Sequence, residues 1–286
     1  MMDYSNCKLC PRECGVDRSA GETGFCGCPD TALVAKTMCH KWEEPVLAGE
    51  GGSGAIFFGG CTLGCSFCQN RAISGAPAGT PMDSRQLRCA MEDLIAQGAE
   101  NIDLVTPTQF LPTLLPALTP KLPVPVVYNC GGYERTQTLD ALRGLVDIYL
   151  PDLKYGNDSL GARLSGVPDY FSVATRAIQA MYDQVGPVRF SGEKLCAGVV
   201  IRHLILPGQV ENSLQVLDWI GEHFAPGQVL VSLMSQYTPM PGQPAPLNRR
   251  ITQEEYDAVL SWMYLNELEG FTQELSAASE CFIPDF

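Results

Sequence analysis

A regular alternation of short apolar runs with longer amphipathic segments fills the chain from Gly54 onward. The apolar runs are rich in β-branched residues, and the segments between them repeat their apolar positions with the period of a helix. Alternating βα units of this kind predict a parallel sheet covered by helices. Because no seventh or eighth unit is evident, we predict an α/β fold with an open, partial (β/α)6 barrel, whose functional residues lie at the carboxyl ends of the strands. The six strands are expected over residues 55–58, 102–105, 124–128, 146–150, 199–206 and 229–234.

Start signals mark two of the helices between these strands. Asp83 and Thr252 are each followed, three residues later, by a side chain that can complete a capping box, Gln86 and Glu255. The polar segment 187–194 is expected to form a hairpin or a loop. Helices are expected over residues 83–97, 109–118, 169–185 and 211–224, and from residue 252 onward.

Composition limits the classes of function that the chain can have. Its 286 residues carry a formal net charge of −13, so no net positive field exists to attract nucleic acid or an anionic membrane. The sequence shows no apolar stretch of membrane-spanning length and no signal-peptide pattern, so we expect a cytoplasmic protein. In that reducing compartment, 13 cysteines indicate metal ligands or redox groups rather than disulfides.

The first part of the chain differs in amino-acid composition from the rest. Five cysteines lie within the first 28 residues, among glycine, proline and charged residues with almost no apolar periodicity. We expect a small cysteine-rich module over residues 1–50, followed by the partial barrel over residues 51–286. Zinc and a second iron–sulfur cluster both fit a closed site of four thiolates, and this module supplies enough ligands for one: Cys7, Cys10, Cys14 and Cys26.

Directly after the first expected strand, three cysteines follow one another in the pattern C-x3-C-x2-C, at Cys61, Cys65 and Cys68. Three thiolates within eight residues, on a loop rich in glycine, can converge on one metal centre. A structural zinc site normally has four protein ligands, and no fourth cysteine follows closely. The spacing instead favours a [4Fe–4S] cluster with one iron left open for another ligand.

The segment CTLGCSFC, with Phe67 at its aromatic position, resembles the cluster motif of the radical S-adenosylmethionine (radical SAM) superfamily. The resemblance extends to the branch of pyruvate formate-lyase activating enzyme, and within it to an incompletely characterised activase-like group. The stretches that carry it are CKLCPRECGVDR, HKWEEP, GSGAIFFGGCTLGCSFCQN, VTPTQF, DIYLPDLKY, IRHLILPG and MSQYTP.

This resemblance implies an oxidoreductase that binds S-adenosylmethionine at the open iron and cleaves it reductively to a 5′-deoxyadenosyl radical. The implied task is hydrogen abstraction, most closely the activation of a glycyl radical enzyme, with a flavodoxin or ferredoxin as electron donor. Modification of a small molecule or a peptide is an alternative. An iron–sulfur protein that only transfers electrons or senses redox state is a third interpretation, from a different class.

The resemblance also implies cofactor contacts at the ends of later strands. Asp152 and Lys154 match the Asp-x-Lys motif of activating enzymes, and residues two apart in a strand point to one side. The family's usual Gly-Gly-Glu, which binds the amino group of S-adenosylmethionine, is replaced by a segment containing Thr106 and Thr108. Hydroxyl groups can accept from an ammonium group, so both threonines are candidates for this role.

Three more polar residues are candidate ligands of S-adenosylmethionine or substrate. Asn129 closes the third expected strand and could hydrogen-bond the ribose or the amino acid part of the cofactor. Arg202 and His203 interrupt an otherwise apolar strand, where a charge is costly unless it is paired. Because neighbouring strand residues face opposite ways, we expect only one of them, preferably Arg202, to point inward. For His203, a hydrogen-bonded place in the core is the alternative.

Overall fold

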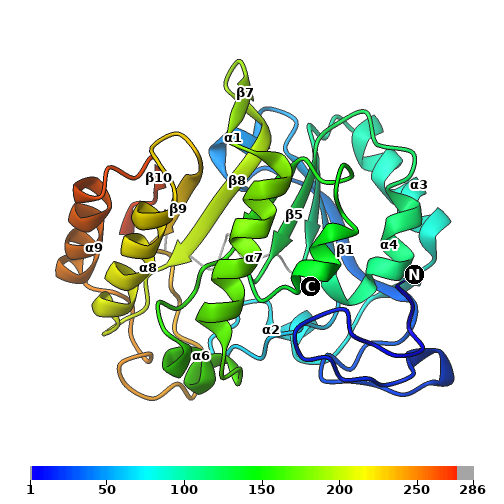
Figure 1. Ribbon diagram of the computed structural model, residues 1–286, viewed down its shortest axis with the longest axis horizontal. Coiled ribbons are helices and arrows are strands. Elements are labelled where there is room, and N and C mark those ends of the chain that lie inside the picture. Colours follow the sequence, from blue (N-terminus) through cyan, green and yellow to red (C-terminus); the bar gives the residue numbers. More distant parts are fainter. Residues whose placement is uncertain (1, 276–286) are drawn as a thin grey trace.

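The computed structural model describes residues 2–275, and its strands form an open, mostly parallel sheet (Figure 1). The sheet order is β10-β9-β8-β6-β5-β4-β2-β1-β3, with β7 paired only to β8. Every neighbouring pair from β2 to β10 along this path is parallel, whereas β1 and β3 pair antiparallel at one end. Among the described residues β3 and β10 end the sheet without meeting, so the predicted partial barrel is confirmed.

All six expected strands are present. Of the four further strands, only β7 falls in a segment, 187–194, where a hairpin or a loop was expected. The third expected strand is shifted from 124–128 to Val126–Cys130 because Pro125 has no N–H to donate to the ladder. The hairpin expected at 187–194 is confirmed, since β7 folds back antiparallel on the start of β8. The strands are β1 (Ala32–His40), β2 (Ser53–Phe58), β3 (Thr80–Met82), β4 (Ile102–Val105), β5 (Val126–Cys130), β6 (Ile148–Pro151), β7 (Arg189–Ser191), β8 (Lys194–Leu204), β9 (Leu230–Met234) and β10 (Gly270–Thr272).

The helices confirm the start signals in the sequence. Asp83 and Thr252 both form complete capping boxes, with Gln86 and Glu255 as partners. The expected helix at 109–118 is divided into a 3₁₀ turn, η2 (Thr108–Phe110), and the short α4. The remaining elements are η1 (Arg18–Ala20), α1 (Pro45–Ala48), α2 (Arg71–Ser74), α3 (Ser84–Ala96), α4 (Leu111–Ala117), α5 (Thr136–Asp140), α6 (Asp158–Ser165), α7 (Tyr170–Val185), α8 (Val210–His223) and α9 (Gln253–Leu265).

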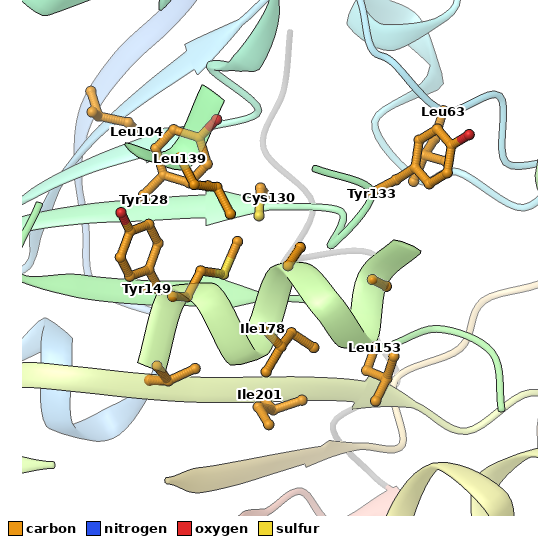
Figure 2. Packing of buried hydrophobic residues seen from close by; sticks show 14 of the residues in the cluster. Leu63, Leu104, Tyr128, Cys130, Tyr133, Leu139, Tyr149, Leu153, Ile178 and Ile201 are labelled. Atoms are coloured by element: carbon orange, nitrogen blue, oxygen red, sulfur yellow. The ribbon is translucent and has the colours of Figure 1, made fainter. Parts of the chain in front are cut away.

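The main core lies between the sheet and the helices that cover one of its faces (Figures 1 and 2). Tyr128 of β5 and Tyr149 of β6 meet edge to face, with ring centroids 5.9 Å apart. Ile178 of α7 and Ile201 of β8 are fully buried in the same cluster. This packing fixes the strands whose carboxyl ends carry the polar residues of the candidate site.

The cysteine-rich segment precedes β1 and lies on the side of the sheet where α2 lies (Figure 1). Residues 32–40, which fall inside the expected 1–50 module, form β1 and pair with β2 of the main sheet. Residues 276–286 of the expected 51–286 domain, and Met1, lie outside the described residues. Between residues 2 and 275, no helix combines the length and apolar character required to cross a bilayer.

Candidate functional site

The three-cysteine loop leaves the carboxyl end of β2 and turns sharply at Gly60. This glycine has a φ of 74°, and an added Cβ would lie 2.2 Å from the sulfur of Cys28, so no other residue fits there. Polar groups meet the loop sulfurs: the Ser165 hydroxyl donates to Cys65 over 3.0 Å, and the Leu63 N–H donates to Cys61 over 3.4 Å. Hydrogen bonds of this kind adjust the potential of an iron–sulfur cluster.

All three thiols line one cavity of about 260 Å³ at the carboxyl ends of the parallel strands. Cys61, Cys65 and Cys68 are free, and each is partly accessible. Within residues 2–275, no three histidine, cysteine or carboxylate side chains already converge on one point as metal ligands, so the thiols must turn inward to bind a cluster. Three free thiols on a glycine-rich loop, facing one cavity, fit a [4Fe–4S] cluster with one iron open.

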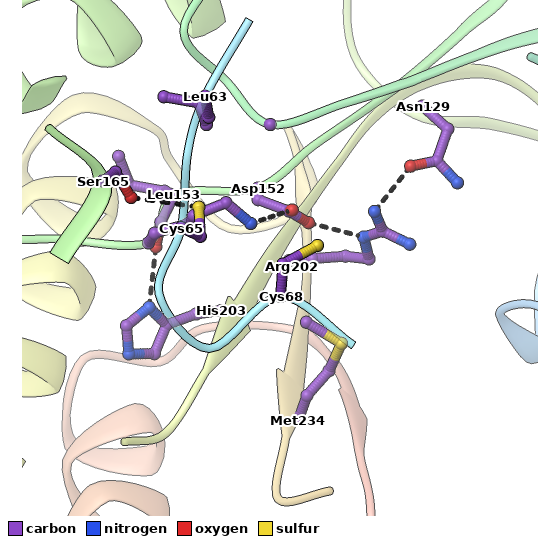
Figure 3. A network of polar contacts seen from close by, with 12 residues as sticks. Leu63, Cys65, Cys68, Asn129, Asp152, Leu153, Ser165, Arg202, His203 and Met234 are labelled. Atoms are coloured by element: carbon purple, nitrogen blue, oxygen red, sulfur yellow. Dashed lines mark hydrogen bonds and ion pairs between the residues drawn. The ribbon is translucent and has the colours of Figure 1, made fainter. Parts of the chain in front are cut away.

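A charged network occupies the other side of this cavity (Figure 3). Asp152 forms ion pairs with Lys154 and with Arg202, whose Nε donates to Asp152 Oδ1 over 2.8 Å. Arg202 also donates from Nη2 to Asn129 Oδ1 over 2.5 Å. The predicted residues Asn129, Asp152, Lys154 and Arg202 are therefore brought together beside the cysteine loop.

The charges of this network keep each member ionised. Burial alone would raise the pKa of Asp152, but the positive charges of Arg202 and Lys154 outweigh it and lower that pKa below its ordinary value. Burial would lower the pKa of Lys154, yet the Asp152 carboxylate raises it above the ordinary lysine value. A fixed ammonium and a fixed guanidinium therefore face the cavity at all ordinary assay pH values.

The two candidate threonines differ in position. Thr106 lines the cavity and has a φ of 58°, a left-handed conformation that is rare for a β-branched residue. Thr108 is buried away from the cavity lining: its hydroxyl donates to Glu134 Oε1 over 2.7 Å and accepts from the hydroxyl of Tyr128. The structure therefore does not bring Thr108 to the cavity, because its hydroxyl is bonded to a buried carboxyl 26 residues further along.

His203 is the other candidate that does not line the cavity. It follows Arg202 in β8, and neighbouring residues of a strand point to opposite faces of the sheet. The Nδ1 of His203 lies 2.7 Å from the Leu153 carbonyl (Figure 3). Its Nε2 lies 2.8 Å from the Ser213 hydroxyl. A carbonyl only accepts, so Nδ1 carries the proton and Nε2 accepts from Ser213. Burial lowers the pKa of His203 to about 4, so the side chain is a neutral, hydrogen-bonded core histidine.

We expect His203 to make the fold less stable as the pH falls. Its pKa is about 4 in the folded chain and roughly 6.5 in an unfolded chain. Between these values only the unfolded chain binds the proton, so the free energy of unfolding should fall by roughly 2 kcal/mol from about pH 7.5 to about pH 5. Urea unfolding at both pH values should show that His203→Gln loses this part of the slope, whereas His223→Gln, at an exposed helix end, keeps it. An unchanged slope in His203→Gln would contradict the assignment.

Three residues of the site could not be found from motif spacing. Gln109 is buried and donates to the carbonyl groups of Gly59 and Gly60, which fixes the start of the cysteine loop. The Tyr170 hydroxyl accepts from the backbone N–H of Lys154 and donates to the Asp152 carbonyl. Glu43 lies 3.6 Å from Arg202. Gln109 lies in the stretch VTPTQF and Glu43 lies in HKWEEP, two stretches that carry the family resemblance. No sequence motif contains Tyr170.

Phe67 lines the cavity from the cysteine loop itself. It is 6% exposed and packs against the rings of Tyr155 and Tyr237, at 6.5 and 6.2 Å between centroids. Its aromatic neighbours anchor the loop between Cys65 and Cys68, which explains why a large apolar residue stands at that position.

A second cavity of about 580 Å³ adjoins the first. Asn129, Arg202 and Met234 line both cavities, and the second is further lined by His40 and Glu43. Arg202 therefore stands between the two spaces, paired with Asp152 toward one and with Glu43 toward the other. A molecule in the second cavity would lie beside a ligand in the first.

The open, mostly parallel sheet is the fold that this chain shares with solved radical SAM enzymes. Over residues 47–108, which contain this loop, the sequence matches the family described as 4Fe-4S single cluster domain. The three-cysteine loop therefore lies inside the stretch that is similar to this family.

The chain is 29% identical over 269 residues to an uncharacterized protein of Methanocaldococcus jannaschii, covering 90% of this chain and 74% of that protein. It is similar in structure to Streptococcus suis SuiB bound to S-adenosylmethionine, with a TM-score of 0.52, 15% identity and 77% of this chain covered. A radical SAM methyltransferase from Sphaerobacter thermophilus gives a TM-score of 0.54, 15% identity and coverage of 77% of this chain and 66% of that one. The chain spans 50% of the length of SuiB.

Proposed function

We propose that this chain is a radical SAM enzyme that cleaves S-adenosylmethionine reductively and uses the 5′-deoxyadenosyl radical to abstract a hydrogen atom. The observation that carries the proposal is the single cavity lined both by Cys61, Cys65 and Cys68 and by Asp152, Lys154 and Arg202. A protein that only transferred electrons would need three or four cluster ligands, but no paired charges beside them.

The residues of the network have distinct roles in this proposal. When bound, the cluster supplies the open iron and the electron that breaks the sulfonium bond. The Lys154 ammonium attracts the carboxylate of S-adenosylmethionine, and Asp152 orients that ammonium. Asn129 is held by Arg202 and offers its amide to the cofactor. Thr106, at the rim of the cavity, offers a hydroxyl and a backbone carbonyl to the cofactor's ammonium group.

For the substrate, we propose that the hydrogen donor is a glycine residue of a partner glycyl radical enzyme, as the motif resemblance implies. A flavodoxin or ferredoxin would supply the electron. A second candidate is a small molecule or a peptide side chain seated in the adjoining cavity, which shares Asn129 and Arg202 with the first. SuiB, which shares the fold, is described in complex with a precursor peptide.

Anaerobic reconstitution tests the enzymatic part of this proposal. With dithionite and S-adenosylmethionine, the reconstituted protein should form 5′-deoxyadenosine, measured by chromatography and mass spectrometry. S-adenosylmethionine should also change the electron paramagnetic resonance spectrum of the reduced cluster, because it becomes a ligand of the open iron. A fully loaded protein that shows neither response would identify an electron carrier instead.

Co-expression separates the two substrate classes. If a glycyl radical enzyme encoded beside this chain is the partner, the mixture should give a carbon-centred doublet that changes when glycine in the partner is deuterated at Cα. 5′-Deoxyadenosine formation that is stimulated by small-molecule or peptide extracts, without that doublet, would favour the second candidate.

A further inference from the structure

Four cysteines before β1 line a small cavity that the proposed reaction does not use. Cys7, Cys10, Cys14 and Cys26 all line it, and its volume is about 10 Å³. All four are free thiols. The backbone also leaves room beside one sulfur, because an added Cβ on Gly24 would lie 2.9 Å from Cys14 Sγ.

Two arginines line the same cavity and have no carboxylate partner among the described residues. Arg18 is 2% exposed, and its guanidinium donates to the carbonyls of Gln109 and Pro29 and lies 3.9 Å from Cys7 Sγ. Arg12 donates to the Thr62 carbonyl over 2.8 Å and stacks on the ring of Phe25. Arg18 is a buried cation without an anion, which is costly, so its surroundings favour negative charge at the facing sulfurs. The half-buried Arg12 acts in the same direction.

Four thiolates around one divalent cation would place negative charge beside the two arginines. The complex keeps two negative charges, which match the two guanidinium groups beside it. The four sulfurs face the cavity without yet converging on one point within residues 2–275, so their side chains must turn inward.

The size of the cavity distinguishes a single ion from a cluster. A single water needs roughly 10–15 Å³ of such space, close to the volume of about 10 Å³ that the four cysteines enclose. The space beside Arg18 and Gln109 is therefore of the order of one ion and far smaller than the four irons and four sulfides of a cluster. Both of those side chains are buried and hydrogen-bonded.

We propose that Cys7, Cys10, Cys14 and Cys26 bind one structural zinc ion. This site is separate from the three-cysteine loop but is connected to it through Arg12, whose Nε donates to the carbonyl of Thr62 inside that loop. Zinc would fix the segment 7–26 and thereby hold Arg12 against the loop. The site does not depend on the proposed function, because it contains none of the three loop cysteines.

Metal analysis of the full chain tests the site without interference from the loop. In a variant with Cys61, Cys65 and Cys68 replaced by alanine, purified anaerobically from cells supplied with iron and zinc, we expect about one zinc and almost no iron per chain. Adding Cys10→Ser should reduce zinc at least tenfold. Adding Cys39→Ala should leave zinc unchanged, because this thiol lies on β1 and does not line the cavity. The proposal would be overturned if the triple variant contained iron and sulfide or no metal. It would also be overturned if the zinc content did not fall when Cys10→Ser was added.

Thiol labelling gives a readout that needs no variant of the module. Cys14 and Cys89 are both exposed, so two free thiols at these positions would react at similar rates with N-ethylmaleimide. With zinc bound, Cys89 should be labelled at least tenfold faster than Cys14, and 1,10-phenanthroline should abolish the difference. Equal labelling of Cys14 and Cys89 in the untreated protein would overturn the zinc site even if Cys10→Ser fails to fold.

Discussion

Replacing Cys61, Cys65 and Cys68 together by alanine is expected to abolish 5′-deoxyadenosine formation and to remove about four irons per chain. Within the described residues, these three sulfurs are the only thiols that line the cavity with Asp152 and Lys154, apart from the buried Cys130. Without them no ligand remains to bind the cluster beside Lys154. Iron and acid-labile sulfide content, with visible absorption, measures the first loss, and product analysis under dithionite measures the second.

Two cysteines outside the cavity provide the matched control. Cys89 lies exposed on α3 and Cys196 lies partly exposed on β8. Replacing both by alanine should leave iron content and product formation unchanged, because neither lines the cavity. If the loop variant keeps its four irons, or if the control loses them, the cluster lies elsewhere and the proposed function is wrong.

The sequence pattern predicted the central sheet well because its strands are buried on both faces. β6 is apolar throughout and β4 is apolar except for the buried Asp103, and the limits of both strands were predicted within two residues. β1 was not predicted, because only its first three residues are buried. β10 has only three residues and depends on parallel pairing with β9, which no local pattern encodes.

A glycine explains why one helix was missed. α6 has eight residues and contains Gly161 near its middle, which reads as a helix breaker in the sequence. In the structure an added Cβ at Gly161 would lie 2.6 Å from the Cβ of Tyr170. The residue that disfavours the helix locally is therefore the one that allows α6 to pack closely on the start of α7.

The residues of the candidate site were also predictable only where neighbouring positions in the sequence determine them. The Asp-x-Lys spacing predicted that Asp152 and Lys154 share a face, because that depends only on the pleat of a strand. The position of the Thr108 hydroxyl depends instead on its hydrogen bonds with Glu134 and Tyr128, which belong to other segments of the chain. The positions of Gln109 and Tyr170 are likewise set by contacts far apart in the sequence.

Asp152→Asn is expected to reduce 5′-deoxyadenosine formation by roughly 30- to 1,000-fold, which corresponds to about 2–4 kcal/mol. Asp152 is the carboxylate that pairs with both Lys154 and Arg202, and the three side chains are 15–19% exposed. An amide in its place leaves two cations close together with insufficient negative charge, so Lys154 should turn away from the position that meets the cofactor carboxylate. The reaction should be followed under saturating and limiting S-adenosylmethionine, because lost cofactor binding raises the concentration needed for half-maximal rate.

Asp140→Asn is the matched control, since it makes the same chemical change in an exposed pair with Arg143. Its effect should stay within roughly twofold, because exposed ion pairs contribute little. Lys154→Met should cost about as much as Asp152→Asn, and the double variant should cost clearly less than the sum, because both changes remove one shared interaction. Additive losses would mean that the two residues act separately and that Asp152 does not orient the Lys154 ammonium.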